Sequence, residues 1–496
     1  STDLSYNITL VDLRKASLVF TSMATRNKLH FVFFPFLAEG HMLPMVDMAK
    51  MLAIRGVRAS VITTEMNVPL VFNSIRRTQS SGFDIQIRTF KFPSAEYSLP
   101  DGVEICGTLS LMEGVDLFEA ILHFCKNTHF MRGSVERLLE ELRPDCVVTD
   151  PFYSWMNDVA ANLDVPMLGL LGSGFFSTSI SACLQIHKPH ANVSSDSEPF
   201  SVPVPGNVIL SKDRMFDLDL IKADEVRKTL SEYKGVVLNT FEELEPLYAE
   251  YYRSVRGDKA WSIGPVSYIN KEAEEKLSRG SARENPKGLE CIEWLDSKAP
   301  NSTIFLSFGS YVSLKDCQLK EIAIALEQCG YGFIWVARTP KREELWLPEG
   351  FEKRMEGKGL IIREWAPQVA ILEHPSIGAF VTHCGWNSVL EGIMSGKAMV
   401  TWPIGAEQFY NERLLVDVLK IGVGVGCRRK CAIYGDEVKK EAIVKAVLRV
   451  MDGEEGERMR ERAMVLRKLG AESVAQNGSS YRNVTDLIAR FGGMPN

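Results

Sequence analysis

The stretch "AFVTHCGWNSVLEGIMSG" (379–396) passes from an apolar run through a polar cluster into a helical pattern. The apolar run predicts a buried strand that ends at His383, and Gly385 allows the backbone to turn sharply. Asn387 and Ser388 then fall in the first turn of the following helix, where unpaired backbone N–H groups and the helix dipole attract anions. A bound phosphate would explain why polar residues gather at this point. Asn and Ser are also common helix caps, so a cluster that only closes the helix remains an alternative.

Strand and helix patterns of this kind recur in two series along the chain. The first begins with "LHFVFFPF" (29–36), followed by a helical pattern and by "VRASVITT" (57–64). The second begins with "TIFLSFGS" (303–310) and continues through 379–396 to "AMVTWP" (398–403). Continuous apolar strands that alternate with helices predict parallel sheets covered on both faces. We therefore expect an α/β fold of two doubly wound domains, with ligands in the cleft where the carboxyl ends of the strands face each other.

Changes in composition suggest where these domains begin and end. The segment "NKEAEEKLSRGSARENPKG" (270–288) is charged and lacks apolar periodicity, which predicts an exposed linker. Met23 resembles a natural start, and "SSYRNVTDLIARF" (479–491) predicts an amphipathic helix. The predicted divisions are an N-terminal lead or cloning remnant outside the fold (1–23), an N-terminal domain (24–265), a linker or exposed loop (266–290), a C-terminal domain (291–475) and a C-terminal helix that packs back on the N-terminal domain (476–496).

Composition excludes several classes of protein. The chain has 496 residues, of which 45% are hydrophobic and 24% are charged, as in a folded protein of two to four domains. Its net charge of −6 offers no basic surface for nucleic acid, and no uncharged apolar run is long enough to cross a membrane. The ten cysteines form no C-x-x-C pairs, which favours free thiols in a reducing compartment. We expect a cytoplasmic monomer.

A histidine and an aspartate follow two strands of the first series. His41 lies in "AEGHMLP", after the first strand and just before a predicted helix, and Asp150 ends the strand "DCVVTD". A histidine pKa near 6.5 suits removal of a proton from a hydroxyl, and a carboxylate can orient the ring through its second nitrogen. The pair is therefore a candidate general base and its partner. An ordinary histidine at a helix start and an aspartate that caps the next helix are the alternatives.

The window from Trp365 to Gln408 carries a more specific signal. It reads "WAPQVAILEHPSIGAFVTHCGWNSVLEGIMSGKAMVTWPIGAEQ". This resembles the 44-residue signature of plant secondary-product UDP-glycosyltransferases of family 1. The resemblance extends to "GHMLP" (40–44), "FPSAEYSLPDG" (92–102) and "VLNTFEELE" (237–245), and thus covers nearly all of 24–496. It is strongest for the group that acts on flavonoids, triterpenoids or steroids.

This resemblance implies a GT-B fold with the acceptor in the N-terminal domain and UDP-glucose in the C-terminal domain. It implies that His41 and Asp150 are the catalytic pair of an inverting transfer to a hydroxyl of a lipophilic small molecule. The implied donor-binding residues are Trp365 and the Ala366 backbone for uracil, Gln368 and Glu391 for ribose, Ser310, His383, Asn387 and Ser388 for the diphosphate, and Trp386, Glu407 and Gln408 for the sugar. For Trp365 and Trp386, packing in the core is the alternative.

Other features of the sequence allow different predictions. The "DLD" at 217–219 imitates a metal-binding D-x-D motif but follows no apolar strand, so we expect no metal and no other cofactor. Lys397 replaces an apolar residue of the family pattern and is predicted to lie in a surface loop. A C-glycosyltransferase, a UDP-sugar epimerase and a nucleotide-sugar-binding module without transfer activity remain as alternatives.

Overall fold

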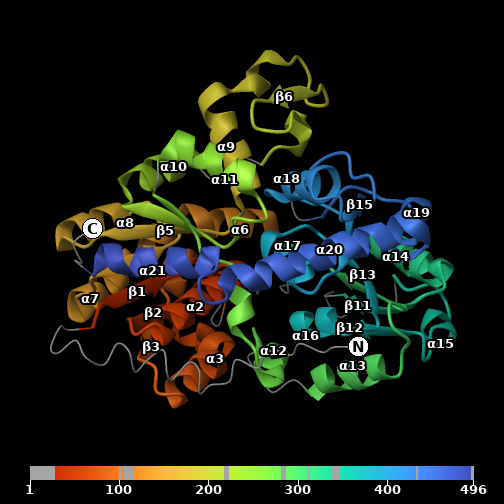
Figure 1. Ribbon diagram of the computed structural model, residues 1–496, viewed down its shortest axis with the longest axis horizontal. Helices are drawn as coiled ribbons and strands as arrows, with labels where there is room; N and C mark the ends of the chain where they lie inside the picture. Colours follow the sequence, from red (N-terminus) through yellow and green to blue (C-terminus); the bar gives the residue numbers. More distant parts are fainter. Residues whose placement is uncertain are drawn as a thin grey trace.

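The structure is a computed structural model that describes residues 28–99, 103–104, 117–216, 223–257, 259–280, 286–310, 312–337, 346–431 and 434–492. The N-terminal lead predicted at 1–23 and the "DLD" at 217–219 lie outside these residues. The described part of the chain forms two large parallel sheets with helices on both faces, one sheet in each half of the molecule (Figure 1). The predicted α/β class with two parallel-sheet halves is confirmed.

The N-terminal sheet is parallel throughout, with strand order β3-β2-β1-β4-β5-β8-β9. Its strands are β1 (His30–Phe34), β2 (Arg58–Thr64), β3 (Ile85–Phe90), β4 (Cys146–Thr149), β5 (Met167–Leu171), β8 (Gly235–Leu238) and β9 (Ala260–Ser262). All five residues of β1, "HFVFF", are buried, as expected for a strand with helices on both faces. The order reverses direction between β1 and β4, so the switch point of this sheet lies where these two strands end.

The C-terminal sheet repeats this arrangement with strand order β12-β11-β10-β13-β14-β15. Its strands are β10 (Thr303–Ser307), β11 (Gly332–Val336), β12 (Gly359–Ile362), β13 (Ile377–Thr382), β14 (Ala398–Thr401) and β15 (Gly422–Gly424). Here the switch point lies between β10 and β13. A small antiparallel hairpin of β6 (Phe200–Val202) and β7 (Val208–Leu210) stands apart from both sheets, at the top of Figure 1.

Helices connect the strands and cover the sheets. In the N-terminal half they are α2 (Glu39–Ile54), α3 (Val68–Ser80), α4 (Ser94–Tyr97), α6 (Leu117–Lys126), α7 (Arg132–Leu142), α8 (Met156–Leu163), α9 (Phe175–His187), α10 (Ala223–Glu232) and α11 (Pro246–Arg256). Later in the chain they are α12 (Ala273–Ser278), α13 (Pro286–Asp296), α14 (Asp316–Cys329), α15 (Phe351–Arg354), α16 (Gln368–Glu373), α17 (Trp386–Met394), α18 (Gln408–Arg413), α19 (Lys440–Met451), α20 (Gly453–Val474) and α21 (Ser479–Phe491). Short 3-10 or π turns are η1 (Glu65–Asn67), η2 (Thr128–Met131), η3 (Pro189–Asn192), η4 (Lys212–Arg214), η5 (Val266–Ile269) and η6 (Leu414–Val418).

The two halves share buried apolar contacts and are spanned by the last two helices. One buried cluster includes Phe176 and Tyr248 from the N-terminal half and Phe380 and Tyr410 from the C-terminal half. The helices α20 and α21 run across the molecule from the C-terminal to the N-terminal sheet (Figure 1). Burying these apolar surfaces against each other favours a closed arrangement of the two halves.

The segment between the halves differs from the exposed loop that we expected. It contains η5 and α12, and α12 begins with a capping box in which the side chains of Glu272 and Glu275 bond to backbone N–H groups. Asn270 is only 4% exposed. Its partly buried residues include the charged Glu275 and Arg279, whose side chains are 16% and 12% exposed, so hydrophobic periodicity did not reveal that the segment is packed.

Lys397 also differs from its expected place in a surface loop. Its side chain is buried, and Nζ donates hydrogen bonds to the carbonyl oxygens of Ile377 at 2.8 Å and His374 at 3.2 Å. Burial lowers the pKa of Lys397 to about 8. Two backbone acceptors allow an amine to be buried at a position where the family pattern has an apolar side chain.

Helix α21 attaches the end of the chain to β9 of the N-terminal sheet. Trp261 Nε1 donates to Asp486 at 2.7 Å, and Asn483 Nδ2 donates to the Ser262 carbonyl at 2.8 Å. Val484 and Leu487 are fully buried on the same face of the helix. Truncating Leu487 should therefore leave a cavity between α21 and the sheet.

We predict that Leu487→Ala lowers the free energy of unfolding by about 2–5 kcal/mol, the usual cost of a buried leucine. Urea unfolding followed by circular dichroism measures the change. The matched control is Arg482→Ala in the same helix, at an exposed position, which should change stability by no more than about 0.5 kcal/mol. Equal stabilities of the two variants would show that α21 does not contribute to the N-terminal core.

Candidate active site

The carboxyl edge of the N-terminal sheet brings His41 and Asp150 together. Asp150 directly follows β4, and His41 lies in the first turn of α2, which follows the neighbouring strand β1. His41 Nδ1 and Asp150 Oδ2 are 2.5 Å apart. The helix begins at Glu39, earlier than we expected, so His41 lies inside it rather than before it.

The surroundings of this pair keep the carboxylate buried and the imidazole partly accessible. The side chain of Asp150 is 3% exposed and that of His41 is 30% exposed. The rings of Phe36 and Phe152 lie 5.4 and 5.8 Å from the imidazole, centre to centre. Burial alone would lower the pKa of His41, but the Asp150 carboxylate raises it above its ordinary value, with a further contribution from Glu407. With Nδ1 bonded to Asp150, Nε2 is the ring nitrogen available to accept a proton.

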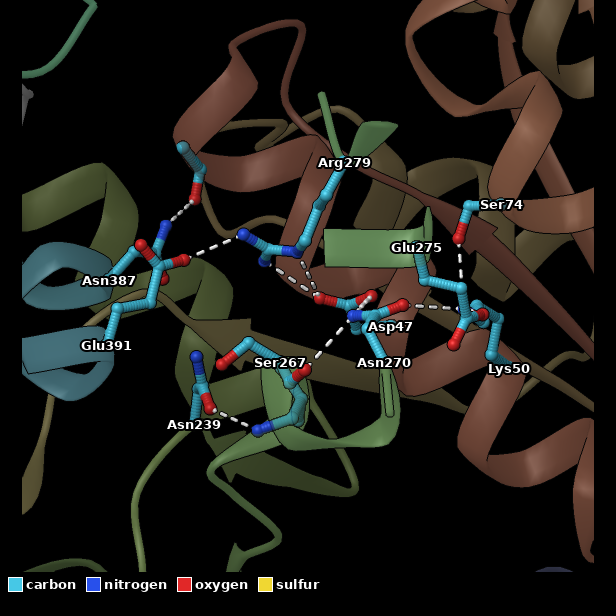
Figure 2. Close-up of polar contacts among 12 residues, drawn as sticks. Asp47, Lys50, Ser74, Asn239, Ser267, Asn270, Glu275, Arg279, Asn387 and Glu391 are labelled. Carbon is cyan, nitrogen blue, oxygen red and sulfur yellow. Dashed lines mark hydrogen bonds and ion pairs between the residues drawn. The ribbon is translucent and has the colours of Figure 1, made fainter. Parts of the chain in front are cut away.

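Helix α2 accepts a hydrogen bond from the C-terminal half at a carbonyl that its own proline cannot satisfy. Pro44 lies inside α2 and has no N–H, so it cannot give the carbonyl of Gly40 its usual i to i+4 hydrogen bond. The Asn387 side chain donates to that carbonyl instead, at a distance of 2.7 Å (Figure 2). Since Gly40 precedes His41, the bond places the first turn of α17 beside the candidate base.

The strand-to-helix turn of 379–396 has the geometry that the sequence predicts. Helix α17 begins at Trp386 with Gly385 as its N-cap, so Asn387 and Ser388 lie in its first turn. His383 is enclosed by two glycines: a Cβ at Gly385 would lie 2.4 Å from its Nε2, and one at Gly309 would lie 2.8 Å from its Nε2. Both turns therefore require glycine, and Gly309 also has a φ of +76°.

His383 presents a buried nitrogen at this turn. Within the described part of the chain, its Nδ1 is buried and has no hydrogen-bond partner. Burial lowers the pKa of His383 to about 4, so the ring is neutral at pH 7. An unsatisfied buried polar atom costs free energy, which points to a ligand at this position. Ser310 follows Gly309 in the neighbouring turn after β10.

The predicted ribose residues form one hydrogen-bonded group. Gln368 Nε2 donates to Glu391 Oε2 at 2.8 Å and to Ser388 Oγ at 3.0 Å. Glu391 is 5% exposed, and Ala366 is also buried. Trp365 Nε1 donates to the carbonyl of Arg279 at 3.0 Å. The residues predicted for the uracil and ribose thus lie together beside α17.

The residues predicted for the sugar differ in which of their hydrogen-bonding groups are already bonded within the protein. Gln408 Oε1 accepts hydrogen bonds from the backbone N–H groups of Ile404 and Gly405, which leaves its amide nitrogen as the donor. Burial raises the pKa of Glu407, and the nearby His41 opposes this shift. Glu407, the last residue but one of the 44-residue window, therefore lies near the candidate base.

Trp386, which we expected to contact the sugar, lies at the boundary between the two halves. It is 2% exposed, and its Nε1 donates to the carbonyl of Asn239 at 2.7 Å. A Cβ at Gly174 would lie 2.6 Å from its ring. Its N–H is therefore engaged between the halves, and its ring packs against the N-terminal half, in agreement with the core-packing alternative.

Sequence reasoning missed four charged or polar residues at this site, namely Asp47, Lys50, Asn270 and Arg279. Arg279 donates to Asp47 Oδ2 at 2.8 Å and to Glu391 Oε1 at 2.7 Å (Figure 2). Two of the four lie in the segment that we expected to be an exposed linker. The Arg-Gly pair at the end of a charged run is the only feature of the linker sequence that pointed to a packed position. No group of three or more His, Cys, Asp or Glu side chains able to hold a metal ion occurs among the residues that the structure describes, and none of its helices is long and apolar enough to cross a membrane.

Comparisons with known proteins agree with this arrangement. Residues 274–469 match the model of the family described as UDP-glucoronosyl and UDP-glucosyl transferase. The chain is 44% identical to UDP-glycosyltransferase 73B3 of Arabidopsis thaliana over 94% of its own length and 98% of that protein. It is also 44% identical to scopoletin glucosyltransferase of Nicotiana tabacum, over 93% of its length and 97% of that protein.

A solved structure shows the same fold. The crystal structure of Glycyrrhiza uralensis UGT73P12, complexed with glycyrrhetinic acid 3-O-monoglucuronide, superposes with a TM-score of 0.85 at 34% identity, covering 94% of this chain and 96% of that one. The two facing parallel sheets are therefore those of a GT-B fold. By its sequence, its relatives and its fold, the chain belongs to the plant UDP-glycosyltransferases of family 1.

Proposed function

We propose that this enzyme transfers glucose from UDP-glucose to a hydroxyl group of a lipophilic small molecule, with inversion and with His41 as general base. The observation that carries the proposal is the 2.5 Å contact between His41 Nδ1 and Asp150, beside the first turn of α17. It joins a candidate base and a candidate phosphate site in one cleft. The N-terminal domain (24–265) holds the acceptor and the C-terminal domain (291–475) holds the donor.

The donor lies across the carboxyl edge of the C-terminal sheet. Trp365 stacks on uracil, and the Ala366 backbone contacts the base edge. Glu391 accepts hydrogen bonds from the ribose hydroxyls, and the amide of Gln368 also bonds to them. The diphosphate lies at the start of α17, where free N–H groups and the helix dipole stabilise negative charge. Its ligands are Ser310, His383 through the unpaired Nδ1, Asn387 and Ser388. Asn387 donates its second Nδ2 hydrogen to phosphate and keeps its bond to the Gly40 carbonyl.

The remaining donor residues hold the sugar beside the base. Glu407 accepts hydrogen bonds from sugar hydroxyls, and Gln408 donates through the nitrogen that its backbone contacts leave available. Trp386 supports this region through its ring while its N–H stays on Asn239. The choice of glucose follows from the glutamine at 408 and the absence of an arginine at 386, as the family pattern implies.

The reaction is one displacement at the anomeric carbon. Nε2 of His41 takes the proton of the acceptor hydroxyl as the oxygen attacks, and Asp150 stabilises the imidazolium that forms. The bond between the anomeric carbon and the UDP oxygen breaks, and UDP leaves with the electron pair. The start of α17 and the polar side chains around it compensate the charge that develops on the diphosphate, so the mechanism requires no metal. Attack from the face opposite to UDP inverts the anomeric centre.

The acceptor class follows from the walls beside His41 and from the relatives. Phe36 and Phe152 give the base an apolar surround that suits a hydrophobic acceptor. One relative is named for scopoletin, and the solved relative binds a glucuronide of glycyrrhetinic acid. A phenolic or triterpenoid hydroxyl is therefore the substrate class that we propose. A cytoplasmic monomer without cofactors stays a prediction from the sequence.

We predict that His41→Ala lowers the rate of glucosyl transfer roughly 10²- to 10⁴-fold while UDP binds with nearly unchanged affinity, because the base contacts the acceptor and not the nucleotide. Transfer is measured by mass spectrometry with UDP-glucose and a panel of flavonols, coumarins and triterpenes, and UDP binding by calorimetry. The control is His129→Ala, an exposed histidine of the same half, which should keep full activity. Near-normal transfer by His41→Ala would rule out this base.

The raised pKa of His41 predicts the pH dependence of the reaction. As the pH falls, His41 becomes protonated and can no longer accept a proton, so kcat/KM should fall with an apparent pKa above 6.5. In Asp150→Asn the carboxylate that raises this pKa is gone and burial lowers it, so the acid limb should move to lower pH. The maximal rate should also fall at least roughly 10²-fold, since the ring loses its orienting partner. If the acid limb stays at the same pH in Asp150→Asn, it does not report the titration of His41.

A further inference from the structure

Arg279 joins the two halves of the molecule at the nucleoside end of the proposed donor site. Its Nε and Nη2 donate to Asp47 Oδ2 of α2 at 3.1 and 2.8 Å. Its Nη1 donates to Glu391 Oε1 of α17 at 2.7 Å. Figure 2 shows the guanidinium between these two carboxylates. One side chain from the segment between the halves thus contacts both halves at once.

The backbone of the same segment contacts Trp365. The carbonyl of Arg279 accepts the indole N–H of Trp365 at 3.0 Å. The next residue, Gly280, has a φ of +73°, and a Cβ there would lie 2.3 Å from Cζ2 of the indole. Arg279 and Gly280 therefore contact both groups that we propose for the nucleoside, namely the Trp365 indole for uracil and the Glu391 carboxylate for ribose.

Arg279 is itself held in place by buried groups of α2. Asn270 Nδ2 donates to the other oxygen of Asp47 at 2.8 Å, and Lys50 Nζ donates to Asn270 Oδ1 at 2.6 Å. Lys50 also pairs with Glu275 of α12 at 3.1 Å, and its side chain is 2% exposed. Burial alone would lower the pKa of Arg279, but the two carboxylates raise it, so the guanidinium stays charged. The arginine is therefore oriented before any ligand arrives.

The contact with Arg279 leaves Glu391 able to bind a diol. A carboxylate oxygen has two acceptor positions. Arg279 uses one on Oε1, and Gln368 uses one on Oε2. A second position on each oxygen can accept a ribose hydroxyl, so the arginine fixes the carboxylate without replacing the ligand. A lysine at 279 has no planar fork and cannot reproduce the three bonds to two carboxylates.

We propose that Arg279 is a positioning residue that orients Glu391 for the ribose diol and makes the enzyme prefer ribonucleotide over deoxyribonucleotide donors. This inference rests on the proposed function, because it assumes that UDP-glucose is the donor. Arg279 also places a positive charge between Asp47 and Glu391, two buried carboxylates that would otherwise repel each other when the halves close. The preference for ribose and the closed arrangement thus depend on the same side chain.

The test compares UDP with 2′-deoxy-UDP by calorimetry, and UDP-glucose with its 2′-deoxyribose analogue in steady-state kinetics. We expect the wild-type protein to prefer UDP roughly 10- to 100-fold, as for a hydrogen bond to a charged group. In Arg279→Met the affinity for UDP should fall about tenfold or more, and the preference for ribose should shrink to about threefold or less. The KM for UDP-glucose should rise more than kcat falls, since the base is untouched. Arg279→Lys keeps the charge and therefore the fold, and should lose the preference in the same way.

The matched control is Lys276→Met. Lys276 lies in α12 and pairs with Glu373 of the C-terminal half at 2.7 Å, so it also joins the segment between the halves to the C-terminal half. The contacts with Glu391 and Trp365, however, come from Arg279. This variant should keep the preference for ribose. Tighter binding of UDP by both Arg279 variants would show that the arginine competes with the donor, and an unchanged preference would show that it does not orient Glu391. Either result overturns the inference about Arg279. UDP binding by the wild type would still support the proposed function in both cases. A wild type that does not bind UDP would overturn both the inference and the proposed function.

Discussion

The hydrogen bond between Asn387 and the carbonyl of Gly40 sets which parts of the two halves face each other at the candidate site. It exists because Pro44 withdraws one N–H from the first part of α2 and leaves a carbonyl without its helical partner. Gly40 is partly buried, and the donor from the other half satisfies its carbonyl where the helix itself cannot. The C-terminal half supplies this donor from the first turn of α17. The missing N–H in α2 thereby determines that the first turn of α17 lies opposite this helix.

The electrostatics of the cleft follow from this juxtaposition. Closing the halves brings Asp47 and Asp150 of the N-terminal half near Glu391 and Glu407 of the C-terminal half, in a region largely removed from water. His41 lies within the field of Asp150 and Glu407, which raises its pKa, and Arg279 lies between Asp47 and Glu391. Arg279 and the titratable His41 thus each interact with one carboxylate from either half. The carboxylates to which we assign roles in the reaction are tolerated at the interface because a positive or titratable partner lies between them.

The sequence predicted those parts of the site that follow from local rules. The ends of buried parallel strands lie on one edge, so His41 and Asp150 could be placed together from the positions of β1 and β4 alone. The first turn of α17 followed in the same way from the glycine and the polar residues after β13. The surface loop predicted for Lys397 was wrong, and the indole bond of Trp386 was not foreseen, because both depend on distant partners: the Ile377 and His374 carbonyls for the amine, and the Asn239 carbonyl for the indole. Arg279 was not found because its partners lie 232 and 112 residues away and its own segment has no apolar period.

Helix α2 connects these observations. Its first turn carries His41 and the carbonyl that receives Asn387, and its next turns carry Asp47 and Lys50, which hold the segment around Arg279. The groups that we assign to the acceptor and the groups that orient the ribose carboxylate are therefore fixed to one rigid element. A helix transmits displacement along its axis with little internal change, because its backbone is fully bonded apart from the position opposite Pro44. Glu391 contacts α2 through Arg279 and Asp47, and Asn387 contacts it at the Gly40 carbonyl, so the C-terminal half is joined to α2 at two separate turns.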